Sequence, residues 1–257
     1  MRSLENQHGR VIDQFNGVAE EESIAEQKVA IVTAAGRGMG AACARELAAN
    51  GYRLALMSPS QESVRLAKEL KGIGLSGSVA NEADLKLLVS ETLKTYGRID
   101  AVVNNTGHPP TGDLLSISDM DWHGGLDLVF LNVVRMARLV TPVFVEQGKG
   151  AIVNISAFGA VEPSLTFPVS CSLRAALSNF TKLYADRYAK SGIRMNSVLP
   201  GFIETWDVTN DVRETIPMKR AGRVNEIAKT VGFLLSDDAG FITGQNIRVD
   251  GGMTHSV

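Results

Sequence analysis

Short apolar segments alternate with longer amphipathic segments from residue 28 to the end of the chain. The apolar segments are rich in Val, Ile, Leu and Ala, which is typical of strands buried on both faces of a sheet. The predicted strands are Lys28–Thr33, Arg53–Met57, Ile73–Val79, Ala101–Asn104, Ala151–Ile155, Arg194–Leu199 and Asn246–Val249. The predicted helices are Met39–Asn50, Gln61–Lys71, Ala83–Tyr96, Leu126–Gln147, Val169–Ser191 and Asn225–Ser236.

This alternation predicts an α/β fold. Strands joined by helix-length connections pair in parallel, and right-handed crossovers place helices on both faces of the sheet. We therefore expect residues 28–257 to form one Rossmann-like, doubly wound domain with a parallel sheet of about seven strands. Residues 1–27 stand outside the pattern and end in the acidic stretch AEEESIAEQ. They are interpreted as an N-terminal extension that is either flexible or in contact with another subunit.

Composition narrows the possible partners. The chain has 257 residues and a formal net charge of −2, so it lacks the basic surface that binds nucleic acid or anionic membranes. Two cysteines, no apolar N-terminal leader and no long apolar run favour a cytoplasmic protein that does not enter a membrane. His8, His123 and His255 show no metal-ligand spacing, so no metal is expected.

A glycine-rich turn separates the first predicted strand from the first predicted helix. It runs from Thr33 to Gly40 with the sequence TAAGRGMG, and its glycines are Gly36, Gly38 and Gly40. Glycine lets a backbone approach its ligand closely, and the N-terminus of the following helix offers free N–H groups and a positive dipole. In this strand–turn–helix context, the turn predicts a site for the pyrophosphate of a dinucleotide.

The end of the second predicted strand bears on the choice of dinucleotide. A carboxylate about 20 residues beyond the glycines would bind the ribose hydroxyls of NAD. The chain instead continues with Ser58, Pro59 and Ser60, and it carries Arg37 inside the glycine turn. A guanidinium can pair with the 2′-phosphate of NADP. We therefore expect NADP(H) to be preferred, with NAD(H) still possible.

Several spaced motifs between Lys28 and Met253 resemble those of the short-chain dehydrogenase/reductase family. Thr33–Gly40 resembles the TGxxxGxG turn, with alanine in place of the first glycine, and Asn104–Gly107 resembles NNAG. Pro200–Thr205 resembles the PGxxxT turn over the nicotinamide, and Phe241–Gly252 is similar to the ending of 3-oxoacyl-carrier-protein reductases. The resemblance implies a dinucleotide site but names no substrate.

The residues that the glycine turn, the second strand and this resemblance together implicate in cofactor binding come from the ends of several strands and from the turns after them. They are Thr33, Gly36, Arg37, Gly38, Met39, Gly40, Ser58, Val79, Asn104, Thr106, Gly107, Arg174, Pro200, Gly201, Ile203 and Thr205.

The resemblance also implies an unusual catalytic set. The family uses a serine after strand five, then a tyrosine and a lysine spaced YxxxK, and an asparagine in helix four. By spacing, Ala157, Ser170 and Arg174 occupy the first three positions, and Asn132 alone is kept. Ser156 is next to the serine position, but strand alternation predicts that it points away from the site.

Ser170 and Arg174 cannot repeat the family's proton transfer. A neighbouring cation lowers a pKa by about 1 to 3 units, which leaves a serine hydroxyl far too weak an acid at neutral pH. Arginine keeps its own proton, although its fork of donors can hold a ribose or an oxyanion. A water held by Ser170, Asn132 and Arg174, or the imidazole of His108, could donate the proton instead.

Three functions remain open at this stage. The first is an NADP(H)-dependent oxidoreductase for a small carbonyl or alcohol substrate, with an atypical proton donor. The second is an NADP(H)-binding protein without turnover, acting as a sensor or as the silent subunit of an oligomer. The third is a non-redox reaction on the same fold. In each case the resemblance implies a homo-oligomer, a homotetramer that pairs through Leu126–Gln147 and Val169–Ser191.

Overall fold

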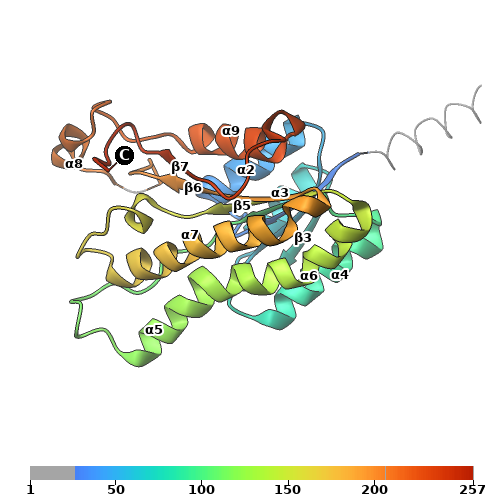
Figure 1. The fold of residues 1–257 in the computed structure, drawn as a ribbon, viewed down its shortest axis with the longest axis horizontal. Coiled ribbons are helices and arrows are strands. Elements are labelled where there is room, and N and C mark those ends of the chain that lie inside the picture. Colours follow the sequence, from blue (N-terminus) through green and yellow to red (C-terminus); the bar gives the residue numbers. More distant parts are fainter. Residues whose placement is uncertain (1–26, 206, 257) are drawn as a thin grey trace, which may run out of the picture.

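The computed structural model describes residues 27–205 and 207–256, and these form one α/β unit around a seven-stranded sheet (Figure 1). All neighbouring strands are parallel, in the order β3-β2-β1-β4-β5-β6-β7. The doubly wound fold expected from the sequence is confirmed. The strands are β1 (Val29–Thr33), β2 (Arg53–Ser58), β3 (Ile73–Ser76), β4 (Ala101–Asn104), β5 (Gly150–Ile155), β6 (Ile193–Pro200) and β7 (Asn246–Val249).

Helices cover both faces of the sheet (Figure 1). On one face, the core combines residues of α2 (Gly38–Ala49), α3 (Glu62–Glu69) and α9 (Val224–Leu235). On the other face, it combines residues of α4 (Glu82–Tyr96), α6 (Asn132–Gln147) and α7 (Pro168–Tyr188). Two separate apolar clusters therefore form, one on each face of the sheet, as burial of strands on both faces requires.

The helix before β5 is longer than the sequence pattern predicts. It starts with α5 (Asp119–Leu126), passes through a π-helical turn at Asp127–Leu131 and continues as α6. Gly124 and Gly125 weaken the helical signal of α5, yet Gly125 is needed there because a β-carbon would lie 2.4 Å from Val169 of α7.

This continuous stretch, Asp119–Gln147, is long and apolar enough to cross a membrane by length and composition alone. Val133, Met136, Val140 and Phe144 of α6 are fully or almost fully buried against the sheet. That burial is the behaviour of a core helix, and we interpret the stretch in this way.

A short helix also escaped the sequence pattern. α8 (Asn210–Thr215) follows β6 and lies between the buried side chains of Val208 and Ile216. Thr209 caps it, with the side-chain oxygen accepting from the backbone N–H of Val212. The predicted extension at residues 1–27 lies outside the described residues, apart from Gln27.

The strand order reverses direction between β1 and β4, and the polypeptide leaves these two strands to opposite sides. In open parallel sheets, ligands bind in the crevice at such a switch point, beyond the carboxyl ends of the strands. The glycine turn after β1 and the Asn104–Gly107 turn after β4 meet there. This edge of the sheet is therefore where a functional site is expected.

Candidate active site

Hydrogen bonds join the glycine turn to the turn after β4. The Thr33 hydroxyl donates to the backbone oxygen of Asn105 over 2.7 Å and accepts from the backbone N–H of Asn105 over 3.0 Å. The side chain of Asn105 donates to the backbone oxygen of Ala34 over 3.2 Å. These hydrogen bonds fix to each other the two turns that the sequence pattern assigns to dinucleotide binding, and we call this pair of turns the floor of the site. Ala34 takes a left-handed conformation with φ 46°, at the position where the family has glycine.

Gly40 leaves no room for a side chain. A β-carbon there would lie 2.3 Å from the backbone oxygen of Ala34 and 2.6 Å from the amide nitrogen of Asn105. Gly38 has φ 56°, and a β-carbon on it would lie 3.1 Å from the methyl group of Thr205. The glycine turn therefore packs directly against both neighbouring turns, and the sequence reason for its glycines is close approach as well as backbone freedom.

We expect Gly40→Ala to abolish dinucleotide binding and to lower the free energy of unfolding by about 1 to 3 kcal/mol, because backbone atoms must move to admit the methyl group. Gly124→Ala is the matched control, since a β-carbon there meets nothing within 4 Å. Urea denaturation and cofactor fluorescence measure the two effects. Unchanged binding and stability in the Gly40→Ala protein would contradict the packing described for the turn.

The end of β2 carries no acid and lies beside the glycine turn. Ser58 is buried, and its hydroxyl donates to the backbone oxygen of Ser60 over 3.0 Å. A β-carbon on Gly36 would lie 2.8 Å from that hydroxyl and 3.1 Å from the β-carbon of Glu62. Glu62 is paired with Arg65 over 2.6 Å, whereas Arg37 is exposed at the start of α2. The local charge is therefore favourable to an anion.

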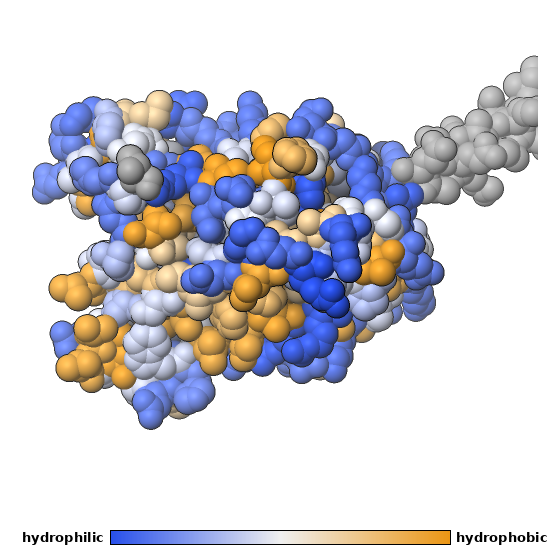
Figure 2. All heavy atoms as spheres, in the orientation of Figure 1, coloured by the Kyte–Doolittle hydropathy of each residue, from blue (hydrophilic) through white to orange (hydrophobic). Residues whose placement is uncertain are grey.

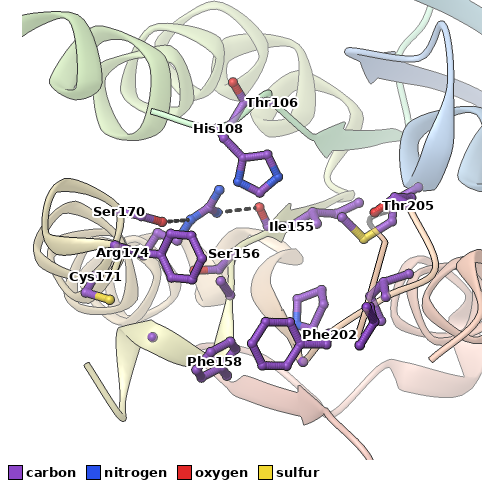
Figure 3. Close-up of a pocket in the computed structure, with 18 of the residues that line it drawn as sticks. Thr106, His108, Ile155, Ser156, Phe158, Ser170, Cys171, Arg174, Phe202 and Thr205 are labelled. Carbon is purple, nitrogen blue, oxygen red and sulfur yellow. Dashed lines mark hydrogen bonds between the residues drawn. The ribbon is translucent and has the colours of Figure 1, made fainter. Parts of the chain in front are cut away.

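A cavity of about 190 Å³ opens from this floor toward α7 and α8 (Figure 3). Met39, Asn105 and Thr106 line it at one end, with Pro200, Gly201, Ile203 and Thr205 beside them. Its other end is lined by Ser156, Ala157, Phe158, Gly159, Phe167, Ser170, Cys171, Arg174, Phe202, Val208, Thr209 and Val212. The cavity thus joins several predicted cofactor residues to the predicted catalytic positions.

Ser170 and Arg174 lie one turn apart on α7, as their spacing predicts, and they contact each other. The Arg174 side chain donates from Nε to the Ser170 hydroxyl over 3.1 Å and from Nη1 to the backbone oxygen of Ile155 over 2.9 Å. Arg174 is only 5% exposed. Burial lowers the pKa of its guanidinium to about 10, and it remains protonated at neutral pH.

His108 lies at the rim of the cavity, with its ring facing the guanidinium of Arg174 (Figure 3). Desolvation of the ring lowers the pKa of His108 below its ordinary value of 6.5, and the positive charge of Arg174 lowers it further. The imidazole of His108 therefore gains a proton less readily than an ordinary histidine does.

Two hydroxyls in the cavity wall are buried without a hydrogen-bond partner, Thr106 Oγ1 and Ser156 Oγ. Such orphaned groups are costly unless a ligand or water completes them. The expectation that Ser156 points away from the site is wrong. Ser156 directly follows β5, its backbone N–H donates to the backbone oxygen of Val198 over 2.8 Å, and both it and Ala157 line the cavity.

Other predicted site residues lie outside the cavity lining. Asn132 is buried directly after the π-helical turn, and its side-chain amide donates to the backbone oxygen of Leu128. Val79 packs in the core on the α4 side of the sheet, and Asn104 donates to Asn154 over 2.9 Å. Gly107 is exposed at the end of its turn. Their roles toward a cofactor stay predictions.

All four tyrosines of the chain lie elsewhere. The hydroxyls of Tyr52 and Tyr96 donate to the backbone oxygens of Leu235 and Leu54, each over 3.2 Å. Tyr184 bonds Thr141 over 2.6 Å, and burial raises its pKa to about 12. Tyr188 packs against the ring of Tyr184, with the ring centroids 4.7 Å apart. None of them can donate a proton in the cavity.

No group of three or more His, Cys, Asp or Glu side chains within residues 27–205 and 207–256 is placed to hold a metal ion. Cys43 and Cys171 are both free and buried. Cys171 lines the cavity, where its sulfur accepts from the backbone N–H of Ser164 over 3.4 Å.

Comparison with known proteins places the chain in a family. Residues 33–254 match the family model described as enoyl-(acyl carrier protein) reductase. The chain is 33% identical over 241 residues to the 3-oxoacyl-[acyl-carrier-protein] reductase FabG of Staphylococcus epidermidis, covering 88% of this chain and 98% of that protein. It is 34% identical over 248 residues to dehydrogenase/reductase SDR family member 4 of Caenorhabditis elegans, covering 89% and 95% of the two chains.

A solved structure with the same fold is also a reductase. The crystal structure of YwfH, an NADPH dependent reductase involved in bacilysin biosynthesis, superposes with a TM-score of 0.85 and 24% sequence identity. The match covers 90% of this chain and all of that one. The α/β sheet and the switch-point site define a nucleotide-binding fold of the dehydrogenase type, and the chain belongs to the short-chain dehydrogenase/reductase family.

Proposed function

We propose that the protein is an NADP(H)-dependent oxidoreductase for a small carbonyl or alcohol substrate, with a proton donor other than tyrosine. One observation carries the proposal. The cavity runs from the cofactor turns to Ser170 and Arg174, and its lining contains no tyrosine among the described residues. The similarity to reductases supports the redox reaction, and YwfH, which shares the fold, is an NADPH dependent reductase.

The residues present fit a dinucleotide. Thr106 Oγ1 lies in the wall of the cavity beside the cofactor turns and is an orphaned group that a ligand would complete. The turn at Thr33–Gly40 would hold the pyrophosphate, and Pro200–Thr205 would lie over the nicotinamide. When bound, the cofactor supplies or accepts a hydride. The protein's own contribution is to place the substrate, to exclude water and to supply or accept one proton.

The reaction also needs a proton donor for the carbonyl oxygen. In our proposal, Ala157, Ser170 and Arg174 stand where relatives carry serine, tyrosine and lysine, so the usual acid is missing. Arg174 orients the carbonyl oxygen or holds a ribose, while Ser170 fixes the guanidinium through its 3.1 Å hydrogen bond. Water held by Ser170 and Arg174, or the imidazolium of His108, delivers the proton. The expected reaction is therefore slow for an ordinary ketone.

The preference for NADP(H) can be tested at Arg37. We expect Arg37→Ala to weaken NADPH binding by about 10- to 100-fold while changing NADH binding little, because only the 2′-phosphate pairs with the guanidinium. Arg138→Ala is the matched control, since Arg138 is an exposed cation of α6. Fluorescence titration with each cofactor measures the ratio. If Arg37→Ala leaves the ratio of NADPH affinity to NADH affinity unchanged, a group other than Arg37 binds the 2′-phosphate.

The competing function is cofactor binding without turnover, and the missing serine, tyrosine and lysine favour it. The two are separated by mixing the protein with NADPH and following its absorbance against a broad panel of aldehydes and ketones. Slow but protein-dependent oxidation of NADPH supports the reductase. Tight binding with no oxidation on any substrate supports a sensor or a silent subunit.

The proposal includes a homotetramer in the cytoplasm. Leu183 of α7 is 67% exposed and Val145 of α6 is 49% exposed, and Figure 2 shows apolar side chains over these two helices. Light scattering at micromolar concentration should give about four times the chain mass of 27.5 kDa. Leu183→Glu should shift the protein toward smaller species, whereas Leu87→Glu on α4 should not. A monomer mass for the unmodified protein would refute the tetramer.

A further inference from the structure

The cavity contains a buried positive charge that no acid of the described chain balances. Arg174 is 5% exposed, and its two hydrogen-bond partners, the Ser170 hydroxyl and the Ile155 backbone oxygen, are both neutral. Within residues 27–205 and 207–256, Nη2 donates to no group, and Arg174 enters no ion pair. The acid in the cavity lining is Asp207, which is exposed. A cation in this setting is unfavourable until an anion reaches it.

The unused donors of Arg174 suit a carboxylate. A guanidinium offers five N–H groups in a planar fork, and Nε and one N–H of Nη1 are already engaged. Nη2 and the rest of Nη1 remain to bind two oxygens in parallel, which is the strongest pairing that arginine makes. The ribose hydroxyls of a cofactor could accept from the same donors, but they are neutral and leave the charge unbalanced.

Much of the wall of the cavity that contains Arg174 is apolar. The rings of Phe158 and Phe202 lie 5.6 Å apart between centroids, and Val208 and Val212 add aliphatic surface. A cavity of about 150 Å³ with apolar walls holds one benzene ring. The cavity of about 190 Å³ in this protein also reaches the cofactor turns, so the space that remains beside Arg174 suits a small substrate, one ring or a short branched chain with a carboxylate.

We infer that Arg174 binds the carboxylate of the substrate, and that the substrates are small oxo acids, or the matching hydroxy acids, with an aromatic or branched apolar body. This inference rests on the proposed function. The carboxylate takes no part in the redox step and stays ionised on Arg174. In reduction, the carbonyl carbon gains the hydride that NADPH loses and the carbonyl oxygen gains a proton, so that C=O becomes CH–OH.

The test compares benzoate with benzamide, which has the same shape but no charge, by calorimetry on the full chain with and without saturating NADP⁺. We expect benzoate to bind at least about 10-fold more tightly than benzamide, because it alone balances the guanidinium. Arg174→Met should remove this preference. Arg138→Met, which deletes an exposed cation of α6, should keep it.

Equal affinity for benzoate and benzamide, or failure of both to bind at millimolar concentration, would overturn the inference. A preference for benzoate that disappears when NADP⁺ is bound would also overturn it, because Arg174 would then be a ribose ligand. If Arg174→Met does not fold, Arg174→Lys replaces it; this variant keeps the charge but loses the fork, and we expect weaker benzoate binding with the preference retained. Cofactor binding is measured separately. Anion binding without NADPH binding would sink the proposed function alone, and reductase activity without anion preference would sink this inference alone.

Discussion

Restoring the family's catalytic set should raise carbonyl reduction by about 100-fold or more, the scale of a positioned general acid. The variant combines Ala157→Ser, Ser170→Tyr and Arg174→Lys. A tyrosine at position 170 would extend from the first turns of α7 into a cavity that has room for its ring. The lysine at position 174 would lower the pKa of that tyrosine, as an adjacent cation does. Turnover of NADPH with a simple ketone measures the gain.

The three substitutions have to be combined, because residues that act as a unit are not additive. Ser170→Tyr alone is the control, and we expect little gain from it, since Arg174 would then stand beside the phenol without the compact ammonium group of lysine. NADPH affinity is measured on every variant. A triple variant that binds NADPH as before and shows no gain would mean that the pocket no longer places a carbonyl for hydride transfer.

His108 should give the unmodified protein its dependence on pH. Its pKa is lowered, first by desolvation and then by the charge of Arg174, so the imidazolium forms only below the ordinary value of 6.5. If the imidazolium is the proton donor, the reduction rate rises as the pH falls through this lowered pKa and levels off below it. His108→Gln should abolish the rise and cost about 100-fold at the acidic plateau.

The matched control is His123→Gln, because His123 is an exposed histidine of α5 outside the cavity lining. Its pH profile should be that of the unmodified protein. The acid decomposition of NADPH is measured without protein and subtracted. If the His108→Gln protein keeps the full pH dependence, His108 is not the proton donor, and water held by Ser170 and Arg174 takes that role.

Much of the fold was predictable because its signals are local. Each of the seven strands was expected within a few residues of its observed bounds, and the five inner strands carry the continuous apolar runs that burial on both faces demands. The turn from Thr33 to Gly40 was also predictable, because glycine is needed wherever neighbouring atoms leave no space for a side chain, and this need is visible in the sequence. The proximity of Ser170 and Arg174 followed from helical spacing.

The remainder depends on tertiary contacts that the sequence pattern does not encode. α8 has six residues, only Val212 among them apolar, so it shows no helical period. Ser156 was assigned to the wrong side because it is the first residue after β5, where the backbone turns into a 3-10 helix at Phe158–Ala160 that the sequence pattern does not show. The absence of a counter-ion beside Arg174 among the described residues is a property of the whole cavity wall, to which several distant segments contribute.

A working NADP(H) site joined to a cavity without the usual acid is the feature on which the proposed function depends. Parallel fluorescence titrations of the unmodified protein with NADPH and NADH test it most directly, because they measure the site without assuming a substrate. We predict saturable binding of NADPH, at least about 10-fold tighter than that of NADH, from the pairing of Arg37 with the 2′-phosphate. No saturation with either cofactor at millimolar concentration, or tighter binding of NADH, would contradict it.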